Sequence, residues 1–313
     1  IASSAGITPA VEQEEAILDA AVGMTTVEAE AAFSLSVVET GKTAIKPEIV
    51  AREKIAMLRK NTLLEFLEPN TSLADVGGLE EAKAWFTQRK RAFSKEARAY
   101  KLPTPKGVLL MGISGCGKTH ALKAVAADLN LPLLKFDLGK AFGSLVGESE
   151  RNIRAALSAA EAVAPCILLL DEMEKGFSGS KSSGQTDGGT SARVVGTFLQ
   201  WMQDKTAPVF VVATANDITQ LPPEMLRKGR WDELFFVDLP TPDEREQIWQ
   251  IQIRRHGRKP EDFGIATADN GPSLVQASDG FTGAEIEQAF IEALYWAFSQ
   301  DREPTTEDVR QCL

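Results

Sequence analysis

The residues with the clearest chemistry lie in one glycine-rich segment, "GISGCGKT", which runs from Gly112 to Thr119. Its spacing fits G-x-x-x-x-G-K-[ST], which forms a phosphate-binding loop when it follows a strand and opens a helix. The glycines let backbone N–H groups close around phosphates, and the helix N-terminus adds positive potential. Lys118 would bridge the β- and γ-phosphates of ATP, and Thr119 would ligate Mg²⁺. The predicted nucleotide contacts here are Gly112, Ile113, Ser114, Gly115, Cys116, Gly117, Lys118, Thr119 and His120.

Polar residues also end two later apolar runs, "CILLLDE" and "VFVVATAND". Asp171, at the end of the first run, could hold Mg²⁺, and Glu172 could polarise an attacking water as a general base. Asn216, at the end of the second, could orient that water without adding charge. Taken alone, the acids would be surface residues after a core strand and Asn216 a turn residue. The phosphate-binding loop upstream favours the catalytic interpretation.

Two arginines, Arg227 and Arg230, lie in the loop "LPPEMLRKGRWDE". Arginines at this spacing are ordinarily a solvated basic patch. The more specific interpretation is a pair of arginine fingers, which stabilise charge on a phosphoryl group in transfer. Acting on the phosphate of a neighbouring subunit would require an oligomer.

The elements that must position these residues are short strands alternating with helices from Lys106 onward. The runs "GVLLMG", "LLKFDL", "CILLLDE", "VFVVATAN" and "LFFVDLP" are continuous and apolar, which is typical of a parallel sheet covered on both faces. After Pro242 the pattern is helical, most clearly in "FTGAEIEQAFIEALYWAF". The sequence therefore predicts an α/β fold with a P-loop NTPase parallel sheet and a small C-terminal helical lid.

The first part of the chain, residues 1–70, has a helical pattern. Thr25 and Glu28 fit a capping box, and a helix follows with an expected apolar face of Val27, Ala31, Leu35 and Val38. Pro47 is predicted to open a further helix through "EIVAREKIAMLRKNTLLEFLE".

Composition limits the class of protein. The 313 residues are 43% hydrophobic and 25% charged, as in ordinary globular proteins. No apolar run is long enough to span a membrane, and a net charge of −10 argues against a nucleic-acid partner. The three cysteines are far apart without metal-ligand spacing, which favours a reducing compartment.

Seven ordered motifs together resemble a known family over about residues 72–313: "LADVGGLEEAK", "PKGVLLMGISGCGKT", "VGESERNIR", "ILLLDE", "ATAND", "LRKGRWDE" and "GFTGAEIEQAF". This set looks like a classical-clade AAA+ ATPase. More narrowly, it resembles the AAA ATPases of cyanobacteria and red-algal plastids that carry a hypothetical-chloroplast-reading-frame name and are linked to photosynthesis and inorganic-carbon use. The resemblance implies three regions: the end of an upstream domain plus a linker (1–70), the nucleotide-binding domain (71–240) and the helical lid (241–313).

The resemblance also implies residue roles. Asn216 would be sensor 1, and Arg227 and Arg230 would be the fingers of a homo-oligomer, which the resemblance implies to be a hexamer. Gly283 and Ala284 would present backbone to the nucleotide. The expected adenine contacts are Asp75, Val76, Gly77, Ile248 and Gln252.

Two positions depart from the family pattern. Glu233 replaces the usual basic residue at the end of the finger motif, which changes the subunit interface. In the expected pore loop, formed by Phe142, Leu145 and Val146, Leu145 replaces the aromatic residue with which classical unfoldases grip a chain. The predicted function is a Mg-ATP-hydrolysing ring that remodels an unknown protein client. A slow nucleotide-dependent switch is the close alternative, and a nucleic-acid-dependent ATPase is a remote one. The expected location is the cytoplasm, or the plastid stroma for a plastid-encoded chain.

Overall fold

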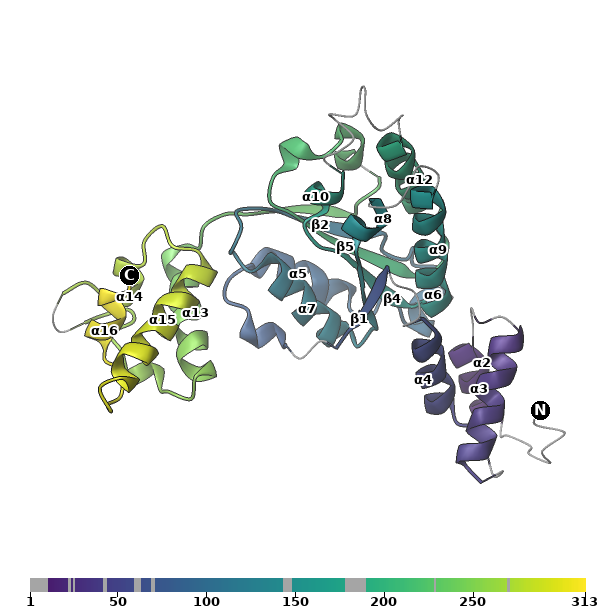
Figure 1. Ribbon diagram of the computed structural model, residues 1–313, viewed down its shortest axis with the longest axis horizontal. Coiled ribbons are helices and arrows are strands. Elements are labelled where there is room, and N and C mark those ends of the chain that lie inside the picture. Colours follow the sequence, from purple (N-terminus) through teal and green to yellow (C-terminus); the bar gives the residue numbers. More distant parts are fainter. Residues whose placement is uncertain are drawn as a thin grey trace.

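The computed structural model describes residues 11–21, 24, 26–41, 44–58, 63–68, 71–142, 148–177, 190–227, 229–268 and 271–313. Figure 1 shows three parts along the chain: N-terminal helices, a central sheet covered by helices, and a C-terminal group of helices. No helix in the described ranges is both long and apolar enough to cross a membrane.

The central sheet has six strands in the order β1-β3-β4-β5-β2-β6. All neighbouring pairs are parallel except β1–β3, which is antiparallel. This arrangement confirms the α/β fold predicted from the alternating pattern. The strands are β1 (Leu64–Leu67), β2 (Gly107–Gly112), β3 (Leu133–Phe136), β4 (Cys166–Leu170), β5 (Val209–Ala215) and β6 (Glu233–Val237).

Strand β1 corrects one sequence prediction. The helix that Pro47 opens, α4 (Pro47–Leu58), was expected to continue through Glu68, but residues 64–67 form an edge strand instead. In this strand Leu64 pairs with Phe136 and Leu67 with Leu133. Pairing with β3 satisfies the backbone of a four-residue segment too short to form a stable helix of its own.

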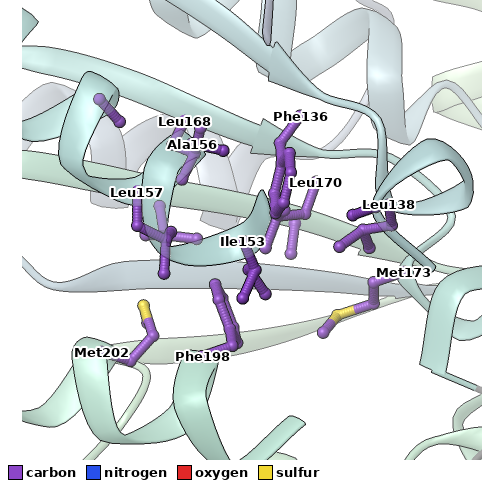
Figure 2. Packing of buried hydrophobic residues seen from close by; sticks show 14 of the residues in the cluster. Phe136, Leu138, Ile153, Ala156, Leu157, Leu168, Leu170, Met173, Phe198 and Met202 are labelled. Atoms are coloured by element: carbon purple, nitrogen blue, oxygen red, sulfur yellow. The ribbon is translucent and has the colours of Figure 1, made fainter. Parts of the chain in front are cut away.

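Each face of the sheet carries its own hydrophobic core because side chains alternate along a strand. In β4, Leu168 and Leu170 point into one core, whereas Ile167 and Leu169 point into the other. The first core, drawn in Figure 2, includes Ile153, Leu157 and Phe198 from two covering helices. That face is covered by α8 (Leu138–Phe142), α9 (Glu148–Val163), α10 (Met173–Phe177) and α12 (Thr190–Asp204).

The opposite face is covered by α5 (Glu80–Arg89) and α7 (Lys118–Leu129). The spacing of Leu122, Val125, Ala126 and Leu129 predicts one apolar helix face. In α7 the first three are buried, and Leu129 is partly buried. The short helix α6 (Lys95–Ala99) precedes β2. Three short 3-10 turns lie in the connections of this unit. They are η1 (Leu73–Asp75) between β1 and α5, and η2 (Ile218–Gln220) and η3 (Pro223–Leu226) between β5 and β6.

The C-terminal helices lie in the region that the sequence predicts to be the lid, and they are called the lid below. They pack around a separate core that includes Trp249, Ile253 and Phe290. The first lid helix begins where Thr241 and Glu244 form a capping box, with Pro242 at its first position. The lid elements are α13 (Pro242–Arg255), η4 (Pro260–Asp262), α14 (Leu274–Ala277), α15 (Gly283–Phe298) and α16 (Thr306–Gln311).

The N-terminal helices α2 (Val11–Ala21) and α3 (Thr26–Glu39) pack with α4 around Ile17, Ala32 and Val50. The predicted buried face of α3 is wrong, since Val27 and Val38 are 76% and 69% exposed. Ser36 is buried instead, and its hydroxyl accepts a 2.8 Å hydrogen bond from the Lys46 backbone N–H. Thr25 of the expected capping box lies outside the described residues.

Candidate active site

A cavity of about 500 Å³ lies at the C-terminal ends of β4 and β5, between the sheet unit and the lid. Parallel strands place the residues that follow them at one edge, where α/β proteins usually bind ligands. The cavity brings together most of the residues predicted to bind nucleotide. Those that line it are Asp75, Val76, Gly77, Ser114, Gly115, Cys116, Gly117, Lys118, Thr119, His120, Asp171, Glu172, Asn216, Ile248, Gln252, Gly283 and Ala284.

The loop between β2 and α7 has the backbone shape that phosphate binding requires. Gly115 and Gly117 have φ angles of +83° and +80°, which favour glycine. Gly112, which ends β2, has a φ of +139°, and a Cβ there would lie 1.9 Å from the Val237 carbonyl oxygen. Because α7 begins at Lys118, the unpaired N–H groups of its first turn face the loop. The loop can therefore cradle an anionic phosphate chain.

Lys118 is buried and turned toward its own loop. Its Nζ donates to the carbonyl oxygens of Gly112, at 2.9 Å, and Ile113, at 2.7 Å. Burial lowers the pKa of this amine. A phosphate oxygen in the cavity would replace these neutral acceptors with a charged one, which makes a stronger hydrogen bond.

Three oxygen-bearing side chains meet at the end of β4. The Thr119 hydroxyl donates to Asp171 Oδ1 at 2.6 Å, and the Thr214 hydroxyl donates to the same oxygen at 2.8 Å. Mg²⁺ in nucleotide enzymes usually binds one or two protein oxygens and completes its shell with phosphates and water. Asp171 and Thr119 fit that donor set.

Glu172 is held by contacts from several elements. Its backbone N–H donates to the Thr214 hydroxyl at 2.8 Å, and its φ of +49° is unusual for a residue with a side chain. The Asn216 amide donates to Glu172 Oε1 at 3.2 Å, and Lys175 Nζ lies 2.5 Å from Oε2. The buried Glu174 accepts from the backbone N–H of Asn216 at 3.1 Å. These contacts place a carboxylate and an amide together beside the loop.

The other end of the cavity is made by the lid and the segment that precedes α5. Gly77 packs so closely on α13 that a Cβ there would lie 2.7 Å from Ile248 Cγ1. Gln252 is buried, and its Oε1 has no hydrogen-bond partner in the part of the chain that the structure describes. The His120 ring nitrogen Nε2 lies 3.1 Å from the Asp75 carbonyl oxygen. Narrow apolar walls with one unpaired amide oxygen fit a planar base that carries a donor.

The lid also contacts the phosphate-binding loop directly. The backbone N–H of Ala284, in the first turn of α15, donates to the Gly115 carbonyl oxygen at 3.1 Å. Gly283 lies beside the same oxygen, because a Cβ added to Gly283 would be 3.6 Å from it. The position of the lid is therefore coupled to the shape of the loop.

Several predicted residues lie elsewhere. Gly112 and Ile113 belong to the loop but do not line the cavity, and neither do Arg227 and Arg230. Arg227 is exposed, and Arg230 donates to the Glu224 carbonyl oxygen. Their loop is fixed to the start of β2, because Asp232 accepts from the backbone N–H groups of Lys106 and Gly107 at 2.6 and 2.9 Å.

The predicted pore loop cannot be compared with the structure. Leu145 and Val146 lie outside the described residues, and Phe142 is described only as the last residue of α8.

Other cavity residues were missed from sequence. Thr214 precedes Asn216 by two positions in "ATAND", so alternation along β5 could have placed it beside Asp171 and Glu172. No comparable pattern marked the others, because separate loops and lid helices bring them to the cavity. They are Leu79, Val237, Asp238, Pro240, Glu244, Ile251, Arg255 and Glu287.

Comparisons with known proteins agree with this geometry. The model for the ATPase family associated with various cellular activities (AAA) matches residues 108–239. The second domain of SpoVK-like AAA ATPases matches residues 2–61. The sheet unit of this chain thus belongs to the AAA ATPase family.

Within that family the chain is similar to uncharacterised algal proteins named ycf46. It is 49% identical to the one from Pyropia yezoensis over 263 residues, 84% of this chain and 52% of the relative. For the Guillardia theta protein the identity is 45% over 266 residues, with 85% and 51% covered. A more distant match is the nuclear valosin-containing protein-like protein of Mus musculus, 33% identical over 241 residues, 74% of this chain and 27% of that protein. The chain spans about half the length of the ycf46 proteins it matches.

Proposed function

We propose that this chain binds Mg-ATP and hydrolyses it in a homo-oligomeric ring, a hexamer, that remodels a protein client. The observation that carries the proposal is the meeting of Lys118, Thr119, Asp171, Glu172 and Asn216 at one cavity. Three segments of the sequence contribute these residues, and their roles match those of P-loop ATPases.

In the proposed reaction the loop backbone and Lys118 bind the phosphates, while Thr119 and Asp171 hold Mg²⁺. When bound between these residues and the nucleotide, Mg²⁺ would supply positive charge that stabilises the negative charge developing on the phosphates. Glu172 accepts a hydrogen bond from the water that attacks the γ-phosphorus, and Asn216 orients that water. Ile248, Gly77 and Gln252 enclose the adenine, and the backbone of Gly283 and Ala284 lies beside the nucleotide.

The positions of Arg227 and Arg230 support the proposed oligomeric ring. Arg227 and Arg230 do not line the cavity of their own chain, yet phosphoryl transfer gains about 10³–10⁵-fold in rate from an arginine finger. We propose that they act on the nucleotide of the neighbouring subunit.

A slow nucleotide-dependent switch is the second candidate. The observation that favours it is that Lys175 and Asn216 together contact both carboxylate oxygens of Glu172. A nucleic-acid-dependent ATPase remains the remote alternative. A location in the cytoplasm or plastid stroma, and a role in photosynthesis or carbon use, are proposed from the family resemblance alone.

The test of hydrolysis is the Glu172→Gln variant. We expect it to bind ATP as the wild type does, to lose at least about 10²-fold in turnover and to accumulate as oligomer, because the amide is isosteric but cannot accept the proton. Phosphate release and nucleotide affinity measured on the same preparations separate these effects. Unchanged turnover would remove Glu172 as the base.

A further inference from the structure

Each carboxylate oxygen of Glu172 accepts a hydrogen bond from another side chain in the arrangement described above. Lys175 Nζ contacts Oε2 at 2.5 Å, and the Asn216 amide donates to Oε1 at 3.2 Å. A general base must accept a hydrogen bond from the water that it polarises. Each of the two contacts therefore competes with the water for a carboxylate oxygen.

The contact with Lys175 is the stronger and the more local of the two. It is a charged hydrogen bond, and it raises the pKa of the lysine amine, so Lys175 stays protonated at neutral pH. The Lys175 backbone N–H also donates to the Glu172 carbonyl oxygen at 2.9 Å, which closes a turn and holds the two side chains on the same side. By contrast, Asn216 directly follows β5 and is expected to stay beside the γ-phosphate during the reaction.

Two other lysines lie near the site, but each contacts a different group. Lys135 Nζ lies 3.9 Å from Asp171 Oδ2, near the limit for an ion pair, and Lys118 is turned toward its own loop. Among the residues that the structure describes, Lys175 is the cation that forms an ion pair with the proposed base.

We infer that Lys175 is a positioning residue that holds Glu172 away from the attacking water and so restrains basal hydrolysis. The inference rests on the proposed function. The step itself changes no covalent bond: the Lys175 ammonium leaves Oε2, and a water O–H takes its place as donor.

The expected restraint is small. The side chains of Lys175 and Glu172 are 69% and 41% exposed, and exposed ion pairs are weak. Loss of the pair should therefore raise turnover by about two- to five-fold. A restraint of this size slows the chain when it is idle, and contacts from a neighbouring subunit or client could overcome it.

The experiment compares three variants of the 313-residue chain at saturating Mg-ATP. Lys175→Met removes the charge but keeps the length, and Lys175→Arg keeps the charge. Lys140→Met is the matched control, because Lys140 pairs with Asp137 at the same i,i+3 spacing, with exposures of 65% and 41%. We expect Lys175→Met to raise kcat about two- to five-fold with KM unchanged, and Lys175→Arg and Lys140→Met to match the wild type.

Salt gives a second readout that a structural role would not move. Screening weakens an exposed ion pair, so added salt should raise the wild-type kcat toward that of Lys175→Met and leave the variant nearly constant. A kcat in Lys175→Met equal to or below that of an active wild type would overturn the inference and leave the proposed function standing. ATP binding without hydrolysis in the wild type and every variant would overturn both.

Discussion

At the scale of single residues, Thr214 connects the two proposed functions of the acidic pair. Its hydroxyl donates to Asp171 Oδ1 and accepts from the Glu172 backbone N–H. One side chain thus fixes both the proposed metal ligand and the backbone of the proposed base. Its position on a buried strand, where it is 2% exposed, makes it rigid.

Replacement of Thr214 by valine should separate binding from hydrolysis. Valine keeps the shape of the side chain but leaves the Glu172 N–H without its acceptor, and small misplacements of catalytic groups are costly. We expect kcat to fall by about 10–100-fold while ATP affinity changes by less than about five-fold. Steady-state kinetics and ATP titration measure the two effects.

The control for this variant is Thr87→Val. Thr87 is on the exposed surface of α5, where its hydroxyl bonds the Lys83 carbonyl oxygen of its own helix. Equal turnover in the Thr214 and Thr87 variants would show that Thr214 does not position the site.

At the scale of elements, the end of α12 is joined to β5 by a partly buried lysine. Lys205 follows α12, and its Nζ donates to the Val209 carbonyl oxygen at 2.5 Å. Trp201 of the same helix lies under the amine, 5.8 Å from ring centroid to Nζ. Burial lowers the pKa of Lys205 to about 8.

This pKa predicts how stability depends on pH. The unfolded chain has a lysine pKa near 10.5, so between pH 8 and 10.5 it binds more protons than the folded chain. Stability from this group must therefore rise with pH across that window and stay flat below it. Relative to Lys205→Met, the wild type should gain on the order of 1–3 kcal/mol between pH 7.5 and 10.

Chemical denaturation of both proteins at several pH values measures this gain. Because other groups titrate equally in the two proteins, the difference between them isolates Lys205. Parallel curves over the whole range would mean that the amine is not desolvated in solution.

At the scale of the whole molecule, the cavity depends on two units that pack separate cores. The lid contributes Ile248, Gln252 and the start of α15, while the sheet unit contributes the loop and the acids. The two units meet at the cavity, where Leu79 N–H donates to Glu244 at 3.2 Å and Ala284 N–H donates to the loop. A nucleotide bound here would contact both units, so binding should change their relative position.

If the arginines act between subunits, two inactive variants should restore each other. The Arg227→Ala subunit keeps Glu172 in its own site but offers no arginine finger to its neighbour. The Glu172→Gln subunit offers the finger but has no base in its own site. Alone, Arg227→Ala should lose about 10³-fold or more in turnover and Glu172→Gln at least about 10²-fold. In mixed oligomers some interfaces would combine a normal Glu172 with a normal Arg227, and we expect hydrolysis to return there.

Phosphate release after mixing the two variants at several ratios measures this complementation. Turnover should peak near equal amounts, because complete interfaces are then most frequent. Absence of recovery in mixtures that do form oligomers would contradict action between subunits, as would full activity of Arg227→Ala as a monomer.

The sequence by itself predicted the parallel sheet, the lid helices and most residues of the cavity. These features follow from local patterns: continuous apolar runs, helical spacing in α7, and the glycine spacing of "GISGCGKT". It missed β1, since a short alternating segment such as "LEFL" becomes a strand only through its pairing with β3. It also chose the wrong face of α3, where apolar residues lie on several sides and the packing against α4 decides which of them are buried.

Only the tertiary structure decided how the acidic pair is held. Thr214, Lys175 and Asn216 contact Glu172 from β5, α10 and the end of β5, and no spacing in the sequence records those three contacts together. The identity of the reactive residues was thus readable from local chemistry, because phosphate loops need particular residue types at fixed spacing. The contacts that hold these residues could not be read from the sequence, because hydrogen bonds between side chains of separate elements depend on where the fold places those elements.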